Sequence, residues 1–129
     1  MILPGIPGSY IYKAEKLVKG VSGLRSFTKG NFRHNLERLI GKAPSWMKKA
    51  EAHHVLPQKF GWFFESKGFS IHDPRFGSWV DKASHSKWSW EYNVYWEDYI
   101  NRYGDEASPE QIIEYARILA NRFGFDVNF

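Results

Sequence analysis

Several features are missing from this chain of 129 residues. It has no cysteine, which excludes disulfide bonds and any metal site built on thiolates. A metal bound here would have to use His, Asp, Glu or Asn side chains. No apolar run approaches the ~18 residues of a membrane-spanning helix, so none is predicted. The start MILPGIPGSY lacks the charged and apolar regions of a signal peptide, and we expect none.

Acidic residues are scarce in the first half of the chain. Residues 1–60 contain 11 Lys and Arg against 3 Asp and Glu, a balance of +8, whereas residues 61–129 contain 7 against 11, a balance of −4. A basic half suits a polyanion such as nucleic acid, and a solvated basic face has the same composition. Since 43% of the residues are apolar and 18% are aromatic, we expect one folded domain and not a disordered chain.

The apolar pattern predicts a mostly helical α+β domain. Residues 1–30 are predicted to form a linker with a short helix at residues 10–18, and residues 31–129 the folded domain. The predicted elements of that domain are a helix over residues 32–40 that ends at Gly41, a short strand within 52–57, a segment at 58–68 with one apolar face, a hairpin arm or extended loop within 69–81, an aromatic helix within residues 84–104, and a final helix with Ser108, Pro109 and Gln111 at its start and Gly124 at its end.

Histidines cluster in the middle of the sequence. Four of the five, His53, His54, His72 and His85, fall within 33 residues. Neighbouring side chains of a strand point to opposite faces, so His53 and His54 cannot both enter one core. Metal-assisted hydrolysis uses such a set, because neutral imidazoles hold a divalent ion while another imidazole deprotonates the attacking water. His85, just before the aromatic helix, is positioned to complete the metal site.

A family resemblance adds to this interpretation. The run from Phe32 to Trp96 resembles the HNH/endonuclease VII nuclease toxins with an AHH-type signature, which form the C-terminal domains of large bacterial polymorphic toxins. The matching pieces are NFRHNLERLIGKAP, AHHVLPQKF, FSIHDP, a lone His85 and YNVYW. The resemblance implies a ββα metal finger with surrounding helices. In that finger His53 would be a metal ligand, His54 the general base and His85 the ligand from the helix.

The chain differs from that superfamily at two points. Phe76-Gly77 stands where an Asn-Gly pair is frequent, and Ser89 stands four residues after His85, where a second histidine is often found. The third metal ligand is therefore open among three side chains: His72, Asp73 and Asn93. Of these, Asp73 is predicted to bind the metal and Asn93 to assist His54 in catalysis.

The resemblance implies a metal-dependent endonuclease toxin that hydrolyses phosphodiester bonds of DNA. It would use one divalent ion (Mg, Zn, Ni or Mn), with Arg33, Lys48 and Lys49 contacting phosphates. It would be secreted or delivered by a bacterium, act in the cytoplasm of a competitor cell and be neutralised by a cognate immunity protein.

Two alternatives stay open. One is a ribonuclease toxin of the same fold. The other is a non-catalytic module with a structural metal, which would bind nucleic acid or protein through exposed tryptophans around Trp88 and Trp90. A structural site has four protein ligands and no open position, whereas a doublet and one helix histidine leave positions open, which favours catalysis.

Overall fold

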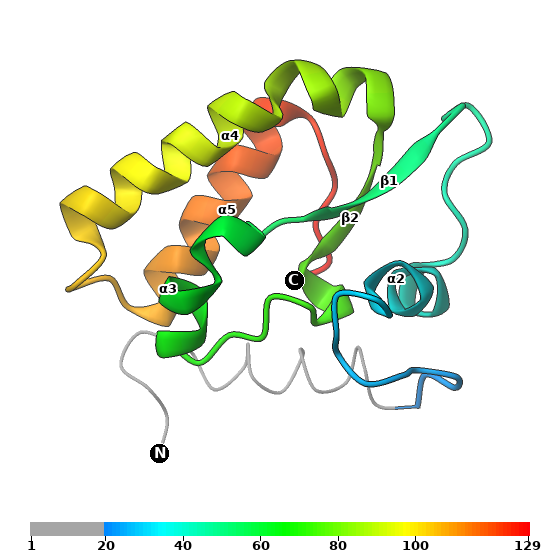
Figure 1. Ribbon diagram of the computed structural model, residues 1–129, viewed down its shortest axis with the longest axis horizontal. Coiled ribbons are helices and arrows are strands. Elements are labelled where there is room, and N and C mark those ends of the chain that lie inside the picture. Colours follow the sequence, from blue (N-terminus) through cyan, green and yellow to red (C-terminus); the bar gives the residue numbers. More distant parts are fainter. Residues whose placement is uncertain (1–19) are drawn as a thin grey trace.

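The computed structural model describes residues 20–129 and is shown in Figure 1. In chain order its elements are helix α2 (Phe32–Ile40), strand β1 (Ala50–His54), the 3₁₀ turn η1 (Gln58–Phe60), helix α3 (Gly61–Ser66), the 3₁₀ turn η2 (Pro74–Phe76), strand β2 (Gly77–Asp81), and helices α4 (Lys82–Tyr103) and α5 (Pro109–Phe123). The α+β class and the dominance of helices are as predicted. The helix predicted at residues 10–18 lies outside the described residues.

The two helices with the best sequence signals form where predicted. Helix α2 covers residues 32–40, and Gly41 follows it with a φ of 89° that favours glycine. At the start of α5, the Ser108 hydroxyl accepts a hydrogen bond from the Gln111 backbone N–H, and the Gln111 side chain accepts one from the Ser108 N–H. This capping box satisfies two backbone donors that the first helical turn leaves unpaired.

Strands β1 and β2 form a two-stranded antiparallel sheet, in which His53 pairs with Ser78 and His54 with Gly77. They are connected by residues 55–76, which include α3 and both 3₁₀ turns. Strand β1 begins at Ala50, earlier than predicted, and it ends before Pro57, which lacks the N–H that a paired strand needs. Helix α4 follows β2 directly in the chain, and the ββα metal finger stays a prediction.

The sheet lies between helix α2 and the packed pair of helices α4 and α5 (Figure 1). In Figure 1, α2 lies on one side of the strands and α4 and α5 pack together on the other. The fully buried side chains include Trp96, Phe64, Leu36 and Leu56. The chain after α5 returns to the sheet, where the Asn128 side chain donates to the Gly77 carbonyl at 3.1 Å. None of the helices within residues 20–129 has the length and apolar character needed to cross a membrane.

Helix α4 differs from its predicted form at its start. It begins at Lys82, after the extended Asp81, so His85 belongs to its first turn and does not precede it. Trp88, expected on the surface, is half-buried and packs against the core, whereas Trp90 is 77% exposed as expected.

Candidate active site

Strand β1 presents its two histidines to opposite faces of the sheet. The ring of His53 lies 4.8 Å from that of Tyr92, on α4, and 4.8 Å from that of Phe125. The ring of His54 stacks on Phe32 of α2, with 3.7 Å between ring centres and 13° between ring planes. The alternation expected of a strand is therefore present, and the two imidazoles have separate surroundings.

His53 is the buried member of the pair. Its side chain belongs to the core, and its Nε2 atom has no hydrogen-bond partner in the part of the chain that the structure describes. A buried polar atom without a partner costs roughly 1–3 kcal/mol. Burial, followed by the charges of His85 and His54, keeps the pKa of His53 well below its ordinary value. His53 is therefore a neutral imidazole with an unpaired nitrogen, and neutral imidazole is the form that binds metals.

His85 and Glu51 lie next to His53. The ring centres of His53 and His85 are 4.9 Å apart, and Nδ1 of His85 lies 3.0 Å from Oε1 of Glu51. Glu51 precedes His53 by two residues on β1, so both side chains point to the same face. Sequence reasoning missed Glu51, although this alternation along the strand was the signal that would have found it.

These three side chains fit a divalent metal by their chemistry. Imidazole nitrogens and carboxylate oxygens are ligands for Zn, Ni and Mn, and the Nε2 of His53 provides a donor atom that has no hydrogen-bond partner among residues 20–129. Within residues 20–129, no group of three or more His, Asp or Glu side chains is already arranged to hold a metal ion. His53, His85 and Glu51 therefore supply suitable donors, and Glu51 and His85 are hydrogen-bonded to each other.

An open pocket of about 300 Å³ lies over this cluster. Asn93 follows His85 by about two helical turns, which brings both to the same face of α4. Four of the predicted site residues line the pocket together with Glu51 and Lys59: His53, His54, His85 and Asn93.

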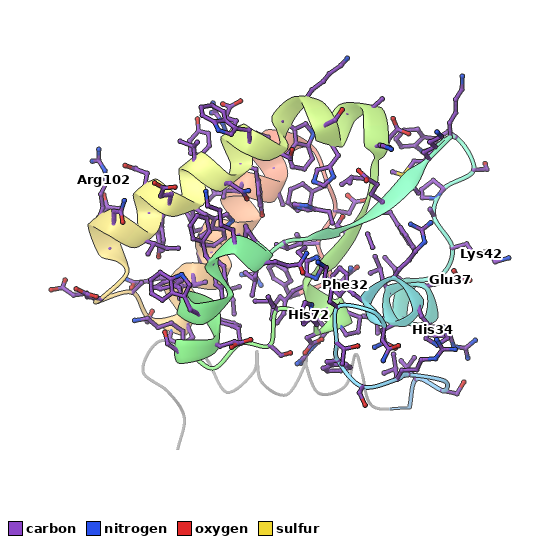
Figure 2. All side chains as sticks on the ribbon, viewed as in Figure 1. Phe32, His34, Glu37, Lys42, His72 and Arg102 are labelled. Atoms are coloured by element: carbon purple, nitrogen blue, oxygen red, sulfur yellow. The ribbon has the colours of Figure 1, made fainter. Side chains whose placement is uncertain are left out.

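His54 has a second histidine as its partner. Its Nε2 atom lies 3.0 Å from Nδ1 of His72, and Figure 2 shows His72 close to Phe32, on which His54 stacks. Burial, followed by the charges of His72 and Lys29, lowers the pKa of His54 to about 4. His54 is therefore neutral near pH 7 and able to accept a proton. The sequence named His72 only as a possible metal ligand and gave no sign of this contact.

Asp73 does not lie with the pocket residues. Its carboxylate accepts from the backbone N–H of Arg75 at 3.0 Å and forms an ion pair with the Arg75 guanidinium, at the start of η2. Asp73 is buried and is not part of the pocket lining. Its role as a metal ligand stays a prediction, and Glu51 is the carboxylate that lies beside His85.

The three predicted phosphate contacts lie near the start of β1. Arg33, exposed on α2, donates from Nη1 to the Ala50 carbonyl at 2.7 Å and lies 4.9 Å over the Trp79 ring. It therefore holds the beginning of β1 against α2. Lys48 and Lys49 precede the strand and are exposed.

Comparison of the chain with protein-family models, with curated proteins and with solved structures finds no match.

Proposed function

We propose that this protein is a metal-dependent endonuclease that hydrolyses phosphodiester bonds of DNA. The observation that carries the proposal is the buried, unpaired Nε2 of His53 beside His85, in a pocket that His54 also lines. Metal-binding donors beside a neutral imidazole in an open pocket are suited to hydrolysis, whereas a structural metal site is closed to water.

Each pocket residue would have its own task. His53 and His85 would hold the metal, with Glu51 or Asn93 as a further donor. When bound, a divalent ion supplies positive charge that polarises a phosphoryl oxygen and stabilises the leaving oxygen. Lys59, exposed at the pocket rim, would attract the nucleic-acid backbone.

His54 would be the general base. Because Nε2 of His54 faces His72, the nitrogen left to face a substrate is Nδ1. It would accept the proton of the water whose oxygen attacks phosphorus, while the bond from phosphorus to one ester oxygen breaks. Stacking on Phe32 and the contact to His72 would hold the ring in one orientation, which hydrolysis requires of a base.

The biological setting follows from the resemblance of the sequence to nuclease toxins. The chain would be a delivered effector that acts in the cytoplasm of a competing bacterium, with a cognate immunity protein that keeps it inactive in the producing cell.

Plasmid digestion tests the proposal. Supercoiled plasmid is incubated with the chain and Mg²⁺, Mn²⁺, Ni²⁺ or Zn²⁺, with and without a chelator, beside a single-stranded DNA and a single-stranded RNA of equal length. We expect nicked and linear DNA with at least one metal and none with the chelator. His34→Ala is the control variant, since His34 lies on α2 and contacts the Gly23 carbonyl outside the pocket. RNA cleavage alone would identify a ribonuclease, and cleavage that the chelator leaves unchanged would reject the metal.

A further inference from the structure

A second pocket lies beside the first turn of α4. It has a volume of about 530 Å³, and its walls include Trp46, Lys48, Lys49, Asp81, Lys82 and Ser86. The backbone N–H of Lys82 donates to the Lys49 carbonyl at 2.8 Å, which joins the beginning of β1 to the beginning of α4. We call these six residues the Trp46 patch.

The charge of the Trp46 patch favours an anion. Lys48, Lys49 and Lys82 are exposed, and none of the three forms an ion pair within residues 20–129. Asp81 is the one carboxylate on the pocket wall, so the positive charge prevails. The first turn of a 22-residue helix also lies here, and the positive end of its dipole adds to the field of the lysines.

Trp46 gives the patch an exposed aromatic surface. Its side chain is 71% exposed, and no other aromatic ring within the described part of the chain contacts it. Trp79 contrasts with it, because that indole lies under Arg33 and donates to the Gly41 carbonyl at 3.0 Å. An exposed indole surrounded by lysines can bind a single strand, because an unpaired base stacks on the indole while the phosphates lie next to the lysines.

The patch is a neighbour of the His53 pocket. His85 lines that pocket and the next residue, Ser86, lines the patch. Glu51, on β1, lines the His53 pocket, and Lys49, two residues earlier in the chain, lines the patch. A polynucleotide that crosses the first turn of α4 would therefore contact both.

We propose that the Trp46 patch binds an unpaired nucleotide next to the cut site, with the base on Trp46 and the phosphates on Lys48, Lys49 and Lys82. This inference rests on the proposed nuclease function and specifies its substrate as nucleic acid that is single-stranded beside the cut. A base inside a duplex is covered by its neighbours on both faces and cannot stack on Trp46.

Binding measurements with a variant that does not cut test the inference. Fluorescence anisotropy is measured for His54→Ala with a labelled single-stranded deoxyribonucleotide, the ribonucleotide of the same sequence and a duplex of the same length. Adding Trp46→Ala should weaken single-strand binding on the order of 10-fold to 100-fold and leave duplex binding within about twofold. Trp46→Tyr should restore most of the affinity, since it keeps a ring. The two single strands show whether the sugar matters.

Trp90→Ala is the matched control, because Trp90 is 77% exposed on α4 and lies outside the patch. It should bind all three probes like its parent. Unchanged single-strand affinity in Trp46→Ala, or an equal loss on the duplex, would overturn the inference. The assay needs no cleavage, so it separates the two claims. A protein that binds this way and never cuts would refute only the proposed function, and one that cuts without dependence on Trp46 would refute only this inference.

Discussion

At the scale of single residues, neighbours in the sequence have different chemistry. His53 faces Tyr92 and Phe125, and its buried Nε2 has no hydrogen-bond partner in the described part of the chain. His54 faces Phe32 and contacts His72. His53 therefore suits the role of metal ligand and His54 the role of general base, although both are histidines on the same strand.

Removal of either histidine assigned to the metal should weaken metal binding. We expect His53→Ala and His85→Ala each to lower the metal affinity at least ~10-fold, because each removes a metal ligand. Even loss of a residue that is hydrogen-bonded to a metal ligand lowers the affinity ~10-fold or more. Isothermal titration calorimetry with Mn²⁺ or Zn²⁺ measures this, with His34→Ala as the histidine that should bind like wild type. Unchanged affinity in both variants would remove the proposed metal site.

His72 should act as a positioning residue for His54. Its Nδ1 lies 3.0 Å from Nε2 of His54, so His72→Ala frees the ring of His54 to rotate. We expect kcat to fall on the order of 10-fold to 100-fold with KM and metal affinity unchanged, and His72→Gln to regain part of the loss because it keeps a polar group near His54. Steady-state cleavage kinetics measure this. Wild-type kcat in His72→Ala would show that the contact has no role in the reaction.

At the scale of elements, what the sequence predicts depends on how local each signal is. Helix α2 and the capping box of α5 were predicted, because their periodicity and caps lie within a few residues of one another. The register of β1 against β2 was not predicted, because the paired residues are separated by residues 55–76. The start of α4 was placed after His85, although the helix begins at Lys82, since its aromatic period begins only after the first turn.

The candidate site divides in the same way. The sequence named His53, His54, His85 and Asn93, which line one pocket, because strand alternation, helical spacing and the family resemblance are all local patterns. It missed the contact of His54 with a residue 18 positions away, since that contact depends on how residues 69–76 return to the sheet. The prediction for Asp73 followed the metal and overlooked a local signal, since the carboxylate pairs with Arg75, two residues along the chain.

The Ser108 cap should contribute measurably to stability. Ser108→Ala removes the acceptor for the Gln111 N–H, and we expect a loss of about 1 kcal/mol in the free energy of unfolding. Urea unfolding followed by circular dichroism measures it, with Ser45→Ala in an exposed turn as the control. Equal stability of the two variants would mean that the cap contributes nothing.

At the scale of the whole molecule, the low pKa of His54 links folding to pH. In the folded chain the pKa is about 4, against 6.5 for an unperturbed histidine, so below pH 6.5 the unfolded chain binds a proton that the folded chain does not. Stability is therefore full above pH 6.5 and falls as the pH drops toward 4. This residue alone should remove about 2 kcal/mol between pH 7 and pH 5, and burial of His53 acts in the same direction.

Urea unfolding of the metal-free protein at pH 7 and pH 5 checks this, with a chelator present. His54→Gln stays neutral at both values, so its loss of stability between pH 7 and pH 5 should be smaller than that of wild type by about 2 kcal/mol. An equal loss in both proteins would show that His54 titrates normally in the folded state.

The central claim is that the pocket of His53, His54 and His85 catalyses phosphodiester hydrolysis, with His54 as a base that does not bind the metal. Single-turnover cleavage of one DNA substrate, measured for wild type and His54→Ala beside their metal affinities, tests it most directly. We predict that His54→Ala lowers the cleavage rate at least ~100-fold and leaves the metal affinity within about threefold. Retained cleavage with lost metal affinity in His54→Ala would show that His54 binds the metal and is not the base.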